Sequence, residues 1–261
     1  MKNNYNLEVQ GIILKKTIYG DTSLILEILC KEVGKISVLA RGIRKGKSKF
    51  SGLFESGNRV ELLLSKKNSS DFYYFKNGTL INAYLFSLGY PRNLLLYAAL
   101  EICHQLLISE DEAENIYSLL LTYFEYLQKQ AENEIAIFWR FLLRLFIVTG
   151  IELNLRRCTF CHLDSSNMVA YYSLRHGFIC EKCFQNHLDE FVINFSFQTA
   201  GIIHILPEIG NHLKNLSISS KTAREVTKIL LLHLSEQFHK KFYCKSIDYY
   251  FENLYHKIKL K

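Results

Sequence analysis

Alternation of apolar and polar side chains marks the first 82 residues as rich in β-strands. The segments with this pattern are separated by turn sequences, of which Tyr19–Asp21 and Lys31–Lys35 each carry a glycine suited to a positive φ. Five short strands with such turns predict a small closed barrel. An OB-type barrel is the smallest common one with this strand count, but periodicity alone does not separate it from an SH3-like barrel. The predicted strands are 11–14, 24–29, 36–40, 60–64 and 72–82.

From Pro91 onward the apolar positions recur at the spacing of helices. A first helix follows Pro91, and the acidic segment Ser109–Glu112 opens a second one that extends to about Gln130. A third helix, 132–149, is apolar on nearly every side and is predicted to be the central one, with Gly150 as its C-terminal stop. Two further helices are predicted at 196–206 and 222–238, and the tail, 247–261, reads as a short helix or a loose end.

The composition agrees with a folded, largely helical chain. Of the 261 residues, 49% are apolar, which supplies material for real cores, and only 2 are proline, which fits helices with short connections. The formal net charge of +7 permits a polyanionic partner without requiring one. Length and pattern together predict one to two domains and a small additional module.

Two C-x2-C pairs, separated by eighteen residues, dominate the segment at about 155–190. Zinc takes four ligands at the corners of a tetrahedron, and each tight turn places two thiolates at two of those corners. Such a site has no open position for a substrate water, so the predicted role of the Zn²⁺ is structural. The four candidate ligands are Cys158, Cys161, Cys180 and Cys183.

The same cysteines allow two other interpretations. Two disulfides could use all four thiols, and a redox-active C-x-x-C pair is also compatible with the spacing. His162, His176 and His187 are close enough in sequence to replace a cysteine, although solvated loop histidines are the simpler interpretation because four thiolates already complete the site. The other cysteines are interpreted as small buried hydrophobic residues; they are Cys30, Cys103 and Cys244.

The order of these elements predicts a multi-domain α+β fold. Residues 1–82 form an OB-fold barrel, and residues 83–261 form a mainly helical domain. Between the two cysteine pairs, 168–173 and 177–179 read as a hairpin, as in a zinc ribbon. Because helical periodicity resumes after it, the metal module at about 155–190 is predicted to be an insertion in the helical domain.

The strongest run of charge, Arg41–Lys49, lies inside the predicted barrel and contains five cations, two glycines and no acid. One interpretation is a solvated, flexible loop. The other is a phosphate-binding loop, since barrels of this kind bind single strands with their loops and one face. In the later strand, alternate members of Phe72–Phe75 must point inward, so at most half of these aromatic side chains are available to stack on bases. The five cations are Arg41, Arg44, Lys45, Lys47 and Lys49.

Several classes of protein are disfavoured by what the sequence lacks. It contains no G-x-x-x-x-G-K-[ST] phosphate loop, no H-E-x-x-H motif and no Asp/Glu–His cluster at metal-catalytic spacing, so no enzyme is predicted. The most apolar run, Ile135–Val148, is too short to span a bilayer and is interrupted by Arg140 and Arg144. Met1–Leu7 shows no secretory signal, so the paired thiols are assigned to a reducing cytoplasm.

Four local stretches, taken in order, resemble the bacterial RecO recombination mediators. The most telling one joins Phe141–Phe146 and Gly150 to Leu155 and the first cysteine pair. Members of this family often have a proline between that glycine and the first cysteine, and this chain has none; some members lack the cysteines, and this chain keeps all four. The resemblance extends from the N-terminus to about residue 250. The other stretches are 11–14 through 19–26 with 34–35, 40–44 into 47–53, and 245–246.

The resemblance implies a DNA repair protein that is not an enzyme, built from an OB barrel, a helical domain and a zinc knuckle. Such proteins bind single- and double-stranded DNA, anneal complementary strands and work with RecR. Together the two proteins displace single-strand-binding protein so that RecA can load, in a gap-repair pathway that often involves RecF. The implied location is the cytoplasm, at the nucleoid.

The resemblance also implies roles for particular residues. On the matching positions, the cations of Arg41–Lys49 are the phosphate contacts, which contribute position and affinity rather than sequence choice. The helical domain of the family recognises the acidic, apolar tail of single-strand-binding protein, to which Arg140 or Arg144 could contribute. The alternative function is that of a zinc-ribbon RNA-binding or ribosome-assembly factor, which would share the basic barrel and the zinc knuckle and would prefer structured RNA.

Overall fold

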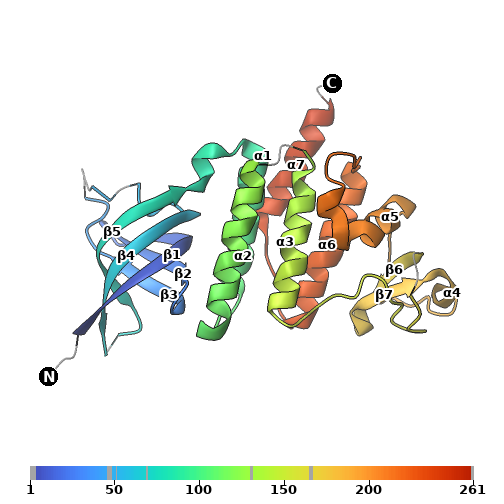
Figure 1. The fold of residues 1–261 in the computed structure, drawn as a ribbon, viewed down its shortest axis with the longest axis horizontal. Coiled ribbons are helices and arrows are strands. Elements are labelled where there is room, and N and C mark those ends of the chain that lie inside the picture. Colours follow the sequence, from blue (N-terminus) through green and yellow to red (C-terminus); the bar gives the residue numbers. More distant parts are fainter. Residues whose placement is uncertain are drawn as a thin grey trace. The chain divides into compact units, whose positions relative to one another are not determined.

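The computed structural model describes residues 4–45, 49–50, 52–68, 70–129, 132–164 and 167–259. Its contacts divide the chain into two compact units (Figure 1). The first unit is Met1–Lys129 with Cys244–Ile247, and the second is Gln130–Tyr243 with Asp248–Lys261.

The first unit contains a closed barrel of five strands in the order β1-β2-β3-β5-β4. Neighbouring strands pair antiparallel except β3 and β5, where Val38 and Leu39 pair in parallel with Tyr73 and Tyr74. All five strands expected from the sequence are therefore present. The strands are β1 (Asn4–Tyr19), β2 (Ser23–Cys30), β3 (Gly34–Ala40), β4 (Asn58–Lys67) and β5 (Tyr73–Ala83).

Alternate residues of each strand supply the apolar core of the barrel. In β2, Leu24 and Leu26 are buried in this core, whereas Ile25 and Glu27 between and beside them are partly exposed. The turn from β2 to β3 contains Gly34 at φ +74°, the left-handed conformation expected for a glycine at this point. Period-two alternation therefore identified the five strands of the barrel.

Two helices, α1 (Tyr90–Gln105) and α2 (Glu110–Lys129), complete the first unit. Helix α1 contacts β1, and helix α2 contacts β2 and β3. The Lys35 Nζ on β3 donates to the carbonyl oxygen of His104 at 2.6 Å and to that of Leu106. These contacts group both helices with the barrel, whereas the sequence placed the division of the chain at residue 82.

The second unit is built around helix α3 (Glu134–Val148). Nine of its fifteen residues are buried, in agreement with the central position expected from its apolar sequence. Trp139 is a core residue, and its Nε1 donates to the Thr227 hydroxyl at 2.8 Å. Gly150, at φ +72°, follows the end of α3 as predicted. The other helices are α5 (Phe197–Ile205), α6 (Ser220–Gln237) and α7 (Lys245–Lys259), so the tail is helical.

A small three-stranded sheet with the order β7-β6-β8 lies between and after the cysteine pairs; its strands β6 and β7 are labelled in Figure 1. Its hairpin of β6 (Met168–Tyr172) and β7 (Gly177–Cys180) confirms the hairpin expected between the two pairs. The third strand, β8 (Val192–Asn194), was not expected, because three residues are too few to display a period. A short helix, α4 (Glu181–Phe184), follows β7.

No described helix combines the length and the apolar character that crossing a membrane requires.

Candidate metal centre and nucleic-acid surface

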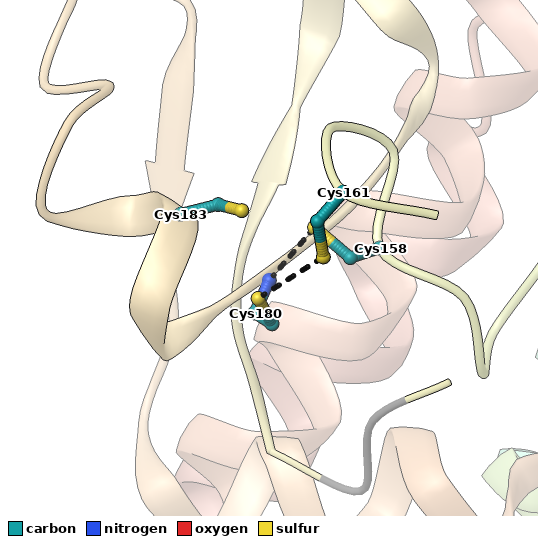
Figure 2. A group of neighbouring side chains, drawn as sticks. All are labelled: Cys158, Cys161, Cys180 and Cys183. Atoms are coloured by element: carbon teal, nitrogen blue, oxygen red, sulfur yellow. Dashed lines mark hydrogen bonds between the residues drawn. The ribbon is translucent and has the colours of Figure 1, made fainter. Parts of the chain in front are cut away.

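The four cysteines of the two C-x2-C pairs converge on one point. Cys158 and Cys161 come from the turn that precedes the sheet, Cys180 ends β7, and Cys183 lies in α4. Their side chains point toward one another, and all four Sγ atoms lie within 4.8 Å of one another (Figure 2). Within the parts of the chain that the structure describes, this is the only group of metal-ligating side chains so arranged.

The spacing of the sulfur atoms fits a tetrahedral metal ion. A Zn–S bond of about 2.3 Å places the sulfur atoms of a regular four-thiolate site about 3.8 Å apart. The Sγ atoms of Cys161 and Cys180 are 3.8 Å apart. A disulfide requires a distance of about 2.05 Å, so this geometry does not fit the disulfide interpretation. Four cysteines close together could therefore hold a metal, and they leave no ligand position for a substrate.

Backbone hydrogen bonds favour the ionised form of one sulfur at this centre, that of Cys158. Burial opposes ionisation of Cys158, but hydrogen bonds from the backbone N–H groups of Cys180, Cys161 and Phe160 lower the pKa of its thiol to about 6. By contrast, burial and the hydrogen bonds of neighbouring thiols raise the pKa of Cys183 to about 12. Thiolates packed this closely repel one another unless a cation neutralises them, so the site has the electrostatics of a cation-binding site.

None of the three nearby histidines belongs to the metal group. His162 is exposed and adopts a left-handed backbone with φ +58°. The ring of His187 stacks on Phe160, with 3.7 Å between the ring centres. His176 lies beside a carboxylate of helix α6. The expectation that four thiolates complete the site without histidine is therefore consistent with the geometry.

Glu236 on α6 binds the polar edge of the metal module. Its Oε2 accepts a hydrogen bond from the Tyr171 hydroxyl at 2.8 Å and lies 3.0 Å from the Nδ1 of His176. Its Oε1 accepts a hydrogen bond from the Ser173 hydroxyl. The Glu236 side chain is only 14% exposed, and these contacts connect α6 to the turn end of the β6–β7 hairpin. Sequence reasoning missed Glu236, because nothing near it in the chain marks it.

Glu236→Gln is expected to lower the free energy of unfolding of the second unit by about 2 kcal/mol. The substitution keeps the volume but replaces a charged acceptor with a neutral amide, and hydrogen bonds to charged groups are worth about 1.5–3 kcal/mol. Denaturant unfolding followed through the fluorescence of Trp139, the single tryptophan, would measure the change. Glu152→Gln, at an exposed site in the same unit, is the matched control, and an equal effect of both would contradict the anchoring role.

The basic run Arg41–Lys49 follows β3 and is attached to the barrel at both ends. Ile43 is buried in the barrel core, and Phe50 packs against the same core. The guanidinium of Arg44 donates to the carbonyl oxygens of Gly20 and Asp21, both at 3.2 Å, so it also supports the β1–β2 turn. Apolar anchors thus fix the ends of the loop, while its described cations stay outside the barrel core.

The cations of this loop face solvent wherever they are described. Arg41, Arg44, Lys45 and Lys49 are all exposed, whereas Lys47 lies outside the described residues. The Lys49 Nζ lies 4.8 Å from the centre of the Phe50 ring. The ring of Phe50 meets Phe75 edge-on, with 4.9 Å between the ring centres. The candidate nucleic-acid surface therefore consists of solvent-exposed cations on a loop whose two ends pack against the barrel core.

The other residues that the sequence analysis singled out lie in different environments. On α3, Arg144 is exposed, whereas Arg140 is partly buried against Gly210. The three other cysteines are buried, which agrees with their interpretation as small hydrophobic residues; burial raises the pKa of Cys103 to about 12.

Two family models cover most of the chain. The model described as "Recombination protein O N terminal" matches residues 1–84, and the one described as "Recombination protein O C terminal" matches residues 89–243. The first match contains the barrel and its basic loop, and the second contains the four cysteines.

Curated proteins named "DNA repair protein RecO" are similar over long alignments. The chain is 31% identical over 154 residues to that of Prosthecochloris aestuarii, an alignment covering 58% of each protein. It is 27% identical over 228 residues to that of Alkaliphilus metalliredigens, covering 86% of this chain and 90% of the relative. It is 26% identical over 233 residues to that of Bacillus subtilis, covering 87% and 88%. The chain spans 58–59% of the length of the first three relatives it matches.

Proposed function

The chain belongs to the recombination protein O family, and on this premise we propose that it is a DNA repair and recombination mediator. It binds single- and double-stranded DNA, anneals complementary strands and, with RecR, helps to load RecA onto DNA coated with single-strand-binding protein. The observation that carries this proposal is the basic loop, whose described cations are exposed on a barrel within the residues matched by the N-terminal family model.

The barrel is assigned to the OB type. Its five strands, their closed order and the parallel pairing of β3 with β5 support this assignment. OB barrels bind single-stranded nucleic acid with their loops and one face. We accordingly assign residues 1–82 to the DNA-binding module and residues 83–261 to a helical region with a metal-binding insertion at about 155–190; the first two helices of this region, α1 and α2, pack against the barrel.

Neutralisation of phosphate charge is enough to promote strand annealing, because annealing forms and breaks no covalent bond. Two DNA strands repel each other through their phosphates, and cations that bind the phosphates remove part of this repulsion. The five cations Arg41, Arg44, Lys45, Lys47 and Lys49 are assigned as these contacts. Each contact releases counterions, so binding weakens steeply as salt is raised. The contacts set position and affinity and leave sequence recognition to base pairing. No catalytic group is needed for this role.

Zinc is assigned as the cofactor, held by Cys158, Cys161, Cys180 and Cys183. When bound, the ion supplies a rigid cross-link and no chemistry of its own, because all four positions are taken by thiolates. The two turns and β7 then hold the insertion in one conformation. Glu236, on α6, anchors this insertion to the helix through hydrogen bonds.

The partners are assigned from the family: DNA, RecR and single-strand-binding protein, with RecF and RecA acting in the same pathway. The acidic tail of single-strand-binding protein requires cations beside apolar surface. Arg144 is exposed on α3, and Ile147, three residues on, is 59% exposed. Function on chromosomal DNA places the protein in the cytoplasm, at the nucleoid.

An annealing assay tests the proposed function. Two complementary oligonucleotides are labelled for energy transfer, coated with single-strand-binding protein and mixed with or without the metal-loaded protein. Faster pairing that fades as salt is raised is the expected result. No acceleration by a folded protein would overturn the mediator function, and a preference for structured RNA would point to an RNA-binding factor.

A further inference from the structure

An imidazole bridges a lysine and a glutamate of the barrel. Lys15 on β1 and Glu27 on β2 are cross-strand partners, a position from which opposite charges can form a direct ion pair. Here the ring of His104, from the last turn of α1, contacts both side chains. Its Nδ1 is 2.7 Å from the Oε2 of Glu27, and its Nε2 is 3.2 Å from the Nζ of Lys15. The three side chains therefore form one chain of hydrogen bonds.

The hydrogen bonds fix the tautomer of this ring. An ammonium group carries only donors, so the Nε2 of His104 accepts from Lys15, and the ring proton is on Nδ1, which donates it to Glu27. The side chains of His104 and Glu27 are 24% and 29% exposed, and Lys15 is exposed. A base that is oriented by a carboxylate and contacts an accessible amine is an arrangement that activates a nucleophile.

The next lysine of β1 has a different partner. Lys16 lies on the other face of the strand, and its Nζ pairs with the carboxylate of Glu55. Among the side chains that the structure describes, no carboxylate forms an ion pair with Lys15. A carboxylate favours the charged, unreactive form of an amine, whereas a neutral imidazole can accept a proton from it. The two neighbouring lysines thus differ in the group that their amines contact.

We propose that Lys15 is a site of acylation by small, activated acyl donors of the acyl phosphate class, and that His104 is the base of this reaction. An acyl phosphate carries its own leaving group and needs no second enzyme. Its phosphate is negatively charged and is attracted by a protein with a net charge of +7. The inference does not depend on the proposed function, because it concerns the reactivity of one amine and not the binding of DNA.

The reaction balances with the groups that are named. The Lys15 ammonium first loses one proton to water, and the free amine attacks the carbonyl carbon of the acyl phosphate. As the C–N bond forms, the Nε2 of His104 takes the second proton from the amine. The C–O bond to the phosphate then breaks, and the phosphate leaves with the electron pair and receives the proton from His104. The products are an amide at Lys15 and inorganic phosphate. Glu27 is a positioning residue, which orients the ring and stabilises its transient positive charge.

Incubation of the full-length protein with acetyl phosphate tests the proposal, with acetylation at each lysine followed over time by fragment-ion mass spectrometry. Lys15 is expected to react about 10-fold or more faster than Lys16, since general base catalysis contributes about 10²–10⁴-fold in enzyme sites. His104→Gln can still form a hydrogen bond but takes no proton, so it should lower the rate at Lys15 to that at Lys16. Glu27→Gln should give an intermediate rate at Lys15. Neither variant should change the rate at Lys16, and thermal unfolding of each checks that the fold is kept.

Glu55→Gln is the matched control, because it removes the carboxylate from Lys16 without supplying a base. If Lys16 then reacts as fast as Lys15, release from an ion pair explains the difference, and the role of His104 is wrong. Equal rates at Lys15 and Lys16 in the unchanged protein, a comparison that needs no variant, would also overturn the proposal, as would a fast Lys15 in folded His104→Gln. Acetyl-coenzyme A at the same concentration is the second arm. Faster acetylation by this thioester would overturn the assignment to acyl phosphates and leave Lys15 as the acylated site.

Discussion

Cys158→Ser is expected to abolish stoichiometric zinc binding and to lower the melting temperature of the second unit by roughly 10 °C or more. Cys158 is fully buried, and its sulfur accepts a hydrogen bond from the backbone N–H of Cys180 at 3.4 Å. Serine cannot supply a thiolate, and structural zinc contributes about 10–16 kcal/mol of apparent binding free energy in zinc-finger peptides. Much of that free energy is folding free energy, because the unfolded chain has no preformed site.

Two measurements check this prediction: the metal content of the purified protein and its thermal unfolding followed through Trp139. Cys103→Ser is the matched control, since it makes the same chemical change at a buried cysteine of the first unit. The control should lose some stability and keep its metal. One equivalent of zinc retained by Cys158→Ser, or a melting temperature of the unchanged protein that a chelator does not alter, would contradict a structural metal.

Lys45→Glu combined with Lys49→Glu is expected to weaken DNA binding by about 10- to 100-fold and to flatten its dependence on salt. Both side chains are exposed, so the fold should be preserved. On single strands each lost phosphate contact reduces the slope of log K against log salt by about 0.7, or about 1.4 for the pair. Titrations at several salt concentrations would give both affinity and slope.

The control for net charge is Lys214→Glu combined with Lys228→Glu, which makes the same change in charge at exposed positions of the second unit. This control should keep most of the salt slope. If both double variants lose affinity equally, general charge rather than the loop governs binding. An unchanged slope for Lys45→Glu with Lys49→Glu would remove the loop from the binding surface.

Most strands and helices were predictable because each has a pattern of apolar and polar residues that repeats along the chain. Alternation in Leu24–Leu29 identified β2, and the apolar run that ends before Gly150 identified α3. The order of such elements, with short matching stretches around them, also indicated the family that both family models confirm. Strand β8 was not predicted, because its three residues are too few to show a repeating pattern.

The candidate metal centre was predictable for a different reason. A C-x2-C pair fixes the distance between two sulfur atoms through one turn of backbone, so most of the geometry is local. Only the meeting of the two pairs is a tertiary event, and the short β6–β7 hairpin between them brings it about. The basic loop was visible as a run of charge, but its anchoring through Ile43 and Phe50 was not, since both depend on the barrel core.

The sequence by itself determined the five barrel strands, the long helices, the four candidate cysteine ligands and the family, all of which depend on backbone periods or on neighbours a few residues apart. Only the tertiary structure decided that Glu236 meets the metal module about sixty residues earlier in the chain, and that His104 bridges Lys15 and Glu27. It also decided that α1 and α2 pack with the barrel. The physical reason is that contacts between distant segments depend on how whole elements pack, and no local pattern records that packing.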